Sequence, residues 1–321
     1  MNKKIVALAV AAAFAIPAAA SAQTTLFGQF KYEVGYIDDG NDSNFVHSTR
    51  GTRIGIRGSE DLGGGLTGIF RFQSGLGGDP NSGMTKAGGE WKMNEENWVG
   101  LQGGFGTLQI GRSDTAIKKT GGNHFRFFVD TLAEGSLAPD QRGQRAEGIH
   151  YTSPNFGGFT GYLTLEPNGV ETDTYWAIGG AYQAGPLWVG GAAESTPDTG
   201  AFANGTVGVG PDQTNYQLGA KWNFGAGEVG LLWQARNDGD DNVFVLPVSY
   251  KVTPNVNLRA AVKHVDPDVG DSGTNYGVGA QYMFSSRTEA FVNLWSDDEA
   301  SGNTFNGADE MHFGFGVRHS F

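Results

Sequence analysis

The segment EMHFGFGVRHSF, residues 310–321, decides the fold of this chain. Successive side chains of a β-strand point to opposite faces, so every second residue of the segment shares a face. One face receives Met311, Phe313, Phe315, Val317, His319 and Phe321. The opposite face receives His312, Gly314, Gly316, Arg318 and Ser320. The first face is mainly apolar and suits lipid, whereas the second suits water, so the segment predicts a strand of a transmembrane β-barrel.

The amino terminus predicts export from the cytoplasm. Two lysines at 3–4 precede an apolar run at 5–20, and the small residues at 20–22 are suited to a cleavage site. These parts in this order are typical of a secretory signal peptide, which we expect at residues 1–22, with the mature chain at 23–321. Because no other segment reaches 18 consecutive apolar residues, the sequence argues against a helical inner-membrane protein.

Composition also favours an exported barrel. The chain contains 52 glycines and 12% aromatic residues, which indicates many strands joined by tight turns. It contains no cysteine, so closed hydrogen bonding rather than disulfides would stabilise it in the periplasm. The formal net charge of −12 becomes more negative once the signal peptide is removed, which argues against a nucleic-acid partner.

Alternation of apolar and polar residues, interrupted by turn residues, predicts sixteen strands. They lie near residues 25–38, 50–60, 66–76, 91–103, 106–114, 145–155, 159–167, 174–184, 187–196, 214–224, 228–238, 242–252, 256–266, 274–284, 288–298 and 310–321. An even number lets one antiparallel chain close on itself, and strands of this length can cross a bilayer when tilted. We therefore expect an all-β protein, a 16-stranded antiparallel transmembrane β-barrel.

The two faces of these strands differ in character. The expected lipid-facing residues are Leu26, Phe30, Tyr32, Val34, Ile54, Ile56, Phe70, Phe72, Tyr216, Leu218, Ala220, Trp222, Phe224, Tyr276, Val278, Ala280, Tyr282 and Phe284. The expected interior residues are Lys31, Glu33, Arg53, Arg57, Arg71, Gln73, Asn215, Gln217, Lys221, Lys251, Arg259, Lys263, Asn275, Gln281 and Arg318. A barrel of about sixteen strands leaves a water-filled lumen that can solvate so many long charged side chains. The sequence therefore predicts a channel.

The connection at 115–144 is the longest between predicted strands. Such long connections in compact domains are usually functional, and we expect this one, the 115–144 loop, to fold into the lumen. Its carboxylates would then face basic residues of the wall. These candidate constriction residues are Asp130, Glu134, Arg53, Arg57 and Arg71. Opposed charges at a narrow section select solutes by charge. The alternative is a loop that only caps the outside of the barrel.

Five stretches of the chain resemble a known family. They are TRIGIRGSEDLGGGLTG at 52–68, ENWVGLQGGFGTLQIGR at 96–112, YTSPNFGGF at 151–159, YMFSSRTEAFVNL at 282–294 and GFGVRHSF at 314–321. In this order, over the whole mature chain, the sequence is similar to the general, non-specific trimeric porins of the Gram-negative outer membrane. The resemblance implies a 16-stranded barrel, a homotrimer, passive diffusion of ions and small hydrophilic solutes, and a third loop that narrows the pore.

The resemblance also implies roles for single residues. Arg53 and Arg57 match basic positions on the second strand that line the constriction of the family, and Asp130 and Glu134 lie in the acidic segment of its loop. Glu95, a further candidate constriction residue, stands where related porins often have a basic residue, which would weaken the attraction for anions. Charges further away than a screening length of about 8 Å count for little. We therefore expect weak ion selectivity that leans towards cations.

Two further roles rest on the resemblance. Arg112 resembles a residue that contacts an acidic second loop of the neighbouring subunit, with Asp79 or Glu90 as its partner. An ion pair within one chain, or a lumenal charge, is the alternative for Arg112. Phe321 resembles the terminal aromatic residue that the barrel-assembly machinery reads as an assembly signal. Lipopolysaccharide and outer-membrane lipid would be the surrounding partners.

Other functions stay open at this point: a substrate-specific outer-membrane channel, and a structural or adhesive barrel. An enzyme is not expected, because the six histidines show no H-x-x-x-H spacing and His319 and Ser320 point to opposite faces. We expect no cofactor and no metal site formed by the protein alone. Acidic outer stretches could share calcium with lipopolysaccharide. These stretches contain Asp38, Asp39 and Asp42, or Asp238, Asp240 and Asp241.

Overall fold

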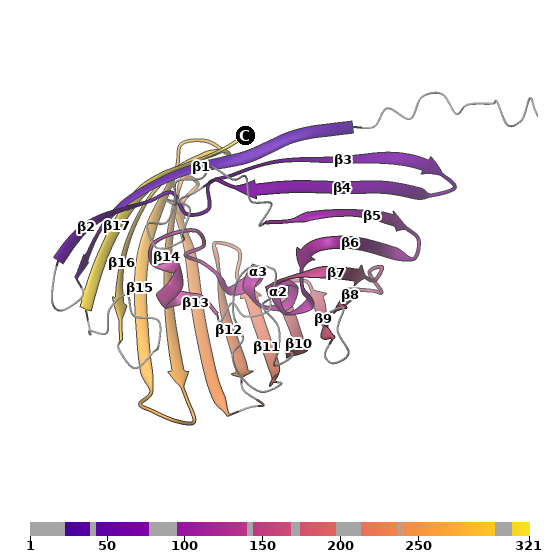
Figure 1. Cartoon of the computed structure of the whole chain (residues 1–321). Coiled ribbons are helices and arrows are strands. Elements are labelled where there is room, and N and C mark those ends of the chain that lie inside the picture. The colour runs from indigo at the N-terminus through magenta and orange to yellow at the C-terminus, as the bar shows by residue number, and fades with distance from the viewer. Residues whose placement is uncertain are drawn as a thin grey trace, which may run out of the picture.

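A computed structural model describes residues 23–38, 43–76, 95–139, 144–167, 174–196, 213–236, 238, 240–298 and 310–321. The expected signal peptide at 1–22 lies outside these residues. In the described chain, seventeen strand segments form one sheet. Its first strand, β1 (Gln23–Asp38), pairs antiparallel with its last, β17 (Glu310–Ser320), so the sheet closes into a barrel (Figure 1). The predicted all-β antiparallel barrel is confirmed.

The other elements follow in chain order. The strands are β2 (Ser43–Ser48), β3 (Arg53–Gly63), β4 (Leu66–Gly75), β5 (Asn97–Gly103), β6 (Gly106–Asp114), β7 (Arg145–Thr152), β8 (Phe159–Glu166), β9 (Tyr175–Ala184), β10 (Leu187–Thr196), β11 (Gln213–Asn223), β12 (Gly227–Arg236), β13 (Asp241–Thr253), β14 (Val256–Asp266), β15 (Gly273–Met283) and β16 (Thr288–Asp297). Three short helices, α2 (Ala116–Thr120), α3 (Gly122–Phe125) and α4 (Glu134–Leu137), lie between β6 and β7.

The seventeen segments occupy sixteen positions in the wall, because β2 and β3 share one position. β3 pairs with the first half of β1, at Gln23–Gln29, and β2 pairs with its second half, at Glu33–Asp38. The sixteen-stranded barrel is therefore confirmed. The sequence predicted a second strand at 50–60, whereas the structure begins β3 at Arg53 and adds β2 before it, with a break at 49–52, where Gly51 has a φ of 81°.

The predicted lipid-facing residues lie on the outside of the barrel. Phe30 is 58% exposed and Leu218 is 57% exposed, whereas their chain neighbours Lys31 and Gln217 are buried on the inner side. This alternation follows from the pleat, which sends successive side chains to opposite faces. Closure pairs the backbone groups of the sheet, so a wall with an apolar outer surface can lie in lipid.

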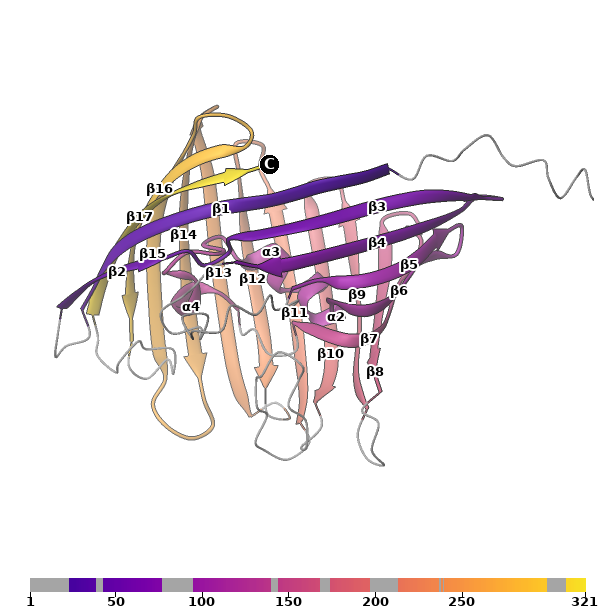
Figure 2. The same ribbon diagram turned by 45° about the horizontal axis from the view of Figure 1, so that its top comes forward.

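The three helices lie inside the curve of the sheet, as both views of the chain show (Figure 1). β6 ends at Asp114 and β7 begins at Arg145, so the connection that contains them is the 115–144 loop. Figure 2 shows α2 and α3 towards the middle strands, and α4 lies against β14, β15 and β16. The described part of the loop thus lies against the inner face of the wall.

Apolar packing attaches the 115–144 loop to this face. Phe128, Leu132 and Leu137 form a buried cluster with Trp295 and other wall residues. Phe125 packs into a second cluster with wall residues that include Trp188, Leu232, Val243 and Val245. Burial of one large apolar side chain contributes about 1.5–3 kcal/mol, so several such residues fix the path of the loop. Phe127 packs against the first of these clusters as a partly buried residue.

Part of the predicted interior face does not meet the lumen. Lys31, Arg259 and Asn275 were expected to be solvated, yet each is buried against the 115–144 loop. Alternation along a strand predicts the face on which a side chain lies. It does not predict that a distant segment will cover that face. Among the described residues, no helix has the length and apolar character needed to cross a membrane.

Candidate functional site

Asp130 is the point where the 115–144 loop meets the second wall strand. Its Oδ2 atom lies 3.2 Å from Nη2 of Arg53 and accepts a hydrogen bond of 2.9 Å from Nε2 of Gln29. Burial alone would raise the pKa of Asp130, but the nearby Arg53 and Arg318 guanidinium groups and the Gln29 hydrogen bond outweigh it and lower the pKa below its usual value. The carboxylate is therefore ionised at neutral pH.

The break in the second strand makes room for this carboxylate. Gly51 lies in the break, and a Cβ atom added there would overlap the Asp130 side chain. Gln29 also donates a hydrogen bond of 2.7 Å to the Gly51 carbonyl. Asp130 itself has a φ of 62°, a left-handed conformation that non-glycine residues rarely adopt. The break at 49–52 in the second wall strand thus accommodates Asp130, a loop residue with a strained backbone.

Glu134 lies one helical turn further along the loop. It accepts a 3.0 Å hydrogen bond from the Asp130 backbone N–H, lies 3.3 Å from Arg50 and forms an ion pair with Arg126. Burial lowers the pKa of Arg126 to about 10, so this side chain remains charged at neutral pH. Glu134 therefore faces two arginines that the sequence had not placed at the site.

A second charge network lies where the loop leaves β6. Arg145 contacts Glu95 at 2.7 Å and Asp114 at 3.2 Å, and Lys118 contacts Asp114 at 2.6 Å. Nearby, Arg71 lies 3.0 Å from Glu96. Glu95 was expected to weaken the attraction of the pore for anions. Its carboxylate instead forms an ion pair with Arg145. The acidic and basic groups of this network largely offset each other.

The structure joins only some of the predicted constriction residues. Arg53 meets Asp130, but Arg71 pairs with Glu96 instead of the loop. Arg57 is exposed and has no acidic partner among the described residues, and its guanidinium lies 5.2 Å from the centre of the Phe27 ring. Sequence reasoning had not assigned roles to Arg50, Glu96 or Arg126. Of their neighbours in sequence, Glu95 pointed to the region.

Arg112 lies outside this site. It is two residues from the exposed Ile110 on β6, so it belongs to the outer face of the strand, and it pairs in register with Glu147 of β7. The Arg112 side chain is buried, whereas Glu147 is exposed. Its expected partners Asp79 and Glu90 lie outside the described residues.

The carboxylates considered for calcium make contacts of their own. Asp238 accepts a backbone hydrogen bond from Thr214, and Asp241 lies 3.6 Å from Arg236. Asp39 and Asp42 lie outside the described residues. Within the described chain, no three His, Cys, Asp or Glu residues form a group that could hold a metal ion.

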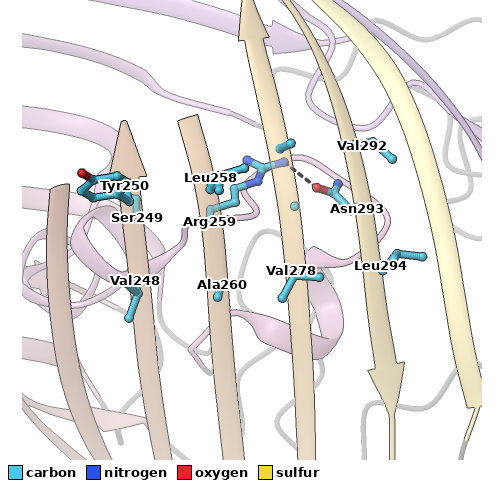
Figure 3. Close-up of a pocket in the computed structure, with 12 residues that line it drawn as sticks. Val248, Ser249, Tyr250, Leu258, Arg259, Ala260, Val278, Val292, Asn293 and Leu294 are labelled. Carbon is cyan, nitrogen blue, oxygen red and sulfur yellow. Dashed lines mark hydrogen bonds between the residues drawn. The ribbon is translucent and has the colours of Figure 1, made fainter. Parts of the chain in front are cut away.

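An apolar depression of about 460 Å³ lies between β13 and β16 (Figure 3). The side chains around it include Val248, Leu258, Val278 and Leu294, which belong to the outer face. It therefore lies on the lipid-facing wall and not in the lumen.

Comparison with known proteins agrees with this architecture. The family model described as Gram-negative porin matches residues 7–301. The outer membrane porin protein 32 of Delftia acidovorans is 31% identical over 366 residues, with 100% of both chains covered. The major outer membrane protein P.IB of Neisseria meningitidis serogroup B, strain MC58, is 28% identical over 348 residues, also with 100% of both chains covered.

Solved structures give the same result. An anion-selective porin from Comamonas acidovorans is 26% identical and superposes with a TM-score of 0.75, covering 94% of this chain and 100% of that one. Salmonella typhi OmpF in complex with daunomycin is 14% identical with a TM-score of 0.76, covering 94% and 98%, which shows the shared fold alone. This chain is therefore a member of the Gram-negative porin family, an outer-membrane barrel that forms a water-filled channel for passive diffusion.

Proposed function

We propose that this porin is a general diffusion channel whose narrowest section lies between the 115–144 loop and β1 to β4, with a weak preference for anions. The observation that supports this is the charge balance at the loop. Asp130 and Glu134 are accompanied by Arg50, Arg53 and Arg126. Arg57 adds a further positive charge without an acidic partner among the described residues. The sequence analysis expected a preference for cations because it did not include Arg50 and Arg126 among the basic residues near the loop carboxylates.

The sign of selectivity is open to direct measurement. The protein is reconstituted in a planar bilayer under a potassium chloride gradient. We expect a reversal potential whose sign shows that chloride permeates more readily than potassium. The variant Arg57→Gln should move that potential towards potassium. A wild-type potential of the opposite sign would reject the anion preference. The solved Comamonas acidovorans relative bears the description anion-selective, which agrees with the proposal.

A substrate-specific channel would need side chains exposed to the solute. The aromatic residues to consider for such a role are Tyr162 on β8 and Phe291 and Trp295 on β16. Phe291 and Trp295 are buried, and Tyr162 packs against two of the buried clusters that include loop residues. They are therefore poorly placed to contact a passing solute. Competition between sugars or amino acids and the ion current would reveal a specific site, and we expect none.

Assembly into a homotrimer is a further part of the proposal. One solved structure of the same fold, Vibrio cholerae OmpT folded in vitro, is described as a trimer form. Arg112 and Glu147, charged residues on the outer face near one end of β6 and β7, would suit a contact between subunits better than contact with lipid. Asp79 and Glu90 stay candidate partners in the neighbouring subunit. Channel closure in three equal steps would support the trimer, and single steps only would contradict it.

Phe321 is proposed to serve as the assembly signal after removal of residues 1–22. Its backbone exchanges two hydrogen bonds with Gly28, of 3.0 and 3.1 Å, at the seam where the barrel closes. Its ring lies so close that a Cβ atom at position 28 would be 2.6 Å from it. Deletion of Phe321 should slow barrel closure in cells, measured by pulse labelling and unheated gels. Lipopolysaccharide, with calcium at the acidic ends of β1 and β13, stays a proposed partner outside the pore.

A further inference from the structure

Several wall side chains bind the backbone of the 115–144 loop, in addition to the apolar packing of its side chains. Nη1 of Arg259 donates a hydrogen bond of 2.8 Å to the Phe127 carbonyl, and Nη2 of Arg318 donates one of 2.9 Å to the Val129 carbonyl. Nζ of Lys31 donates to the Asp130 carbonyl. Three cations from β14, β17 and β1 therefore bind three carbonyls within four residues of the loop.

Two further wall residues extend this pattern. The Glu33 carboxylate accepts a 2.9 Å hydrogen bond from the Leu132 backbone N–H. Asn275 of β15 donates a 2.9 Å hydrogen bond to the Ser136 carbonyl. From residue 127 to residue 136, backbone groups of the loop thus meet side chains of four different wall strands. These contacts do not depend on the identity of the loop side chains.

The wall also orients the cations that bind the loop. Arg259 donates a 2.8 Å hydrogen bond to Asn293, as the close-up shows (Figure 3), and lies 4.6 Å from the ring of Phe128. Nζ of Lys31 lies 2.6 Å from the Glu33 carboxylate. Arg318 lies 3.6 Å from Glu289. Each of these three donors is therefore held in place by a second wall residue. The wall itself thus orients the groups that bind the loop backbone.

Burial makes these contacts important while the loop is docked. Lys31 and Arg259 are almost fully buried beneath the loop, so the loop carbonyls replace water as hydrogen-bond acceptors for these cations. The acidic side chains of the loop meet a different group, formed by Arg53, Arg50 and the loop residue Arg126. The wall contacts to the loop carbonyls and the wall contacts to the loop carboxylates therefore involve different atoms of the loop, although Arg318 also lies near the Asp130 carboxylate.

We propose that Lys31, Arg259 and Arg318 are positioning residues that fix the 115–144 loop through its backbone carbonyls, independently of its acidic side chains. The consequence is that loop charge can change without release of the loop. A measurement of single-channel conductance rests on the proposed function, because it assumes that the loop forms the narrowest section of the pore. A measurement of loop position that does not use the channel tests the positioning role separately from the proposed function.

The absence of cysteine from the chain supplies that readout. Ser136 is fully buried beneath the wall contacts, so Ser136→Cys gives one thiol that is protected while the loop is docked. Its rate of reaction with a charged methanethiosulfonate reagent reports release of the loop. The test variant adds Arg259→Met and Arg318→Met to Ser136→Cys. Lys31 is retained, since its removal would also leave Glu33 without its ion pair.

The matched control adds Arg57→Met to Ser136→Cys, because Arg57 is a basic wall residue without a loop contact among the described residues. A second control adds Asp130→Asn and Glu134→Gln. Loss of two charge-assisted hydrogen bonds should raise the reaction rate by about tenfold or more, while both controls stay within about twofold of Ser136→Cys alone. The variant with Arg259→Lys and Arg318→Lys should recover most of the protection. Unheated gel migration checks that each barrel is folded.

The outcomes are distinct. Faster thiol reaction together with larger single-channel conductance supports both the positioning role and the constriction. Faster reaction with unchanged conductance supports the positioning role and rejects the constriction. An unchanged reaction rate in the folded double methionine variant, or equal acceleration in the Asp130→Asn Glu134→Gln control, would overturn the inference.

Discussion

Two parts of the inner wall share a sequence pattern but differ in their surroundings. On β1 and β14, the inward-facing Lys31 and Arg259 are buried against the 115–144 loop. On β3 and β4, the inward-facing Arg57 and Arg71 keep contact with solvent, and their charges lie near Phe27 or Glu96 rather than the loop. The same alternation of outward and inward residues therefore produces inward cations with two different surroundings. We propose that the covered cations hold the loop and that the open ones influence the solute.

Lys31→Met should separate the two regions most strongly. It leaves the Glu33 carboxylate buried without its ion-pair partner, and loss of one member of a buried pair costs about 3–5 kcal/mol. The same change at the exposed Arg57 should alter the free energy of unfolding by no more than about 0.5 kcal/mol. Urea unfolding in detergent micelles, followed by tryptophan fluorescence, measures both. Equal losses would mean that the loop does not distinguish the two regions.

Gly51→Ala tests the boundary between the regions. The added Cβ would overlap Asp130 and adopt a positive φ, at a cost of about 1–3 kcal/mol, so the loop should move and single-channel conductance should rise. Gly185→Ala is the matched control, because Gly185 also has a positive φ but has no atom near the added Cβ. Unchanged conductance in Gly51→Ala would show that the channel does not depend on this contact.

The double variant Asp130→Asn Glu134→Gln tests how the negative charge of the 115–144 loop affects ion selectivity. Removal of two carboxylates close to Arg53 and Arg50 should raise the ratio of chloride to potassium permeability by about twofold. Reversal potentials under a salt gradient measure the ratio. Glu60→Gln Asp61→Asn removes the same charge at a turn of the barrel and should have a smaller effect. No shift in the first variant would mean that the loop lies away from the constriction.

The smallest expected effect concerns pH. Burial, with help from Lys221, lowers the pKa of His124 to about 4, so the docked loop gains no charge from this residue between pH 6 and pH 8. We expect the reversal potential to show no step near pH 6.5. Because the pKa is lower in the docked state, docking is fully favoured above pH 6.5 and weakens as the pH falls towards 4. His124→Gln should remove that loss, measured by the Ser136→Cys reaction rate.

The wall of the barrel could be predicted almost completely from sequence. Strands such as β10 and β14 have the predicted bounds, and the outward residues Phe30, Leu218 and Val278 are exposed as expected. Strand alternation is a local property of two neighbouring residues, and turn residues mark where it ends. The exception is the second strand, whose break at 49–52 accommodates a residue far along the chain.

The site could be predicted only in part. Asp130 and Arg53 were expected to face each other, and they form an ion pair. The partners of Glu134 and Arg71 were not predicted. Arg50 reaches Glu134 only once the loop has folded against the wall, Arg126 meets Glu134 within the folded loop, and Glu96 meets Arg71 where β4 pairs with β5. No spacing along the sequence encodes contacts between residues separated by tens of positions.

The sequence by itself determined the barrel, its strand number and the face on which each wall residue lies, since these follow from the period of two in a β-strand and from the need to pair every backbone group in lipid. Only the tertiary structure decided which inward charges line the channel and which hold the loop. That decision depends on where the 115–144 loop packs, and burial beneath it changes Lys31 and Arg259 from expected solvated charges into donors for loop carbonyls.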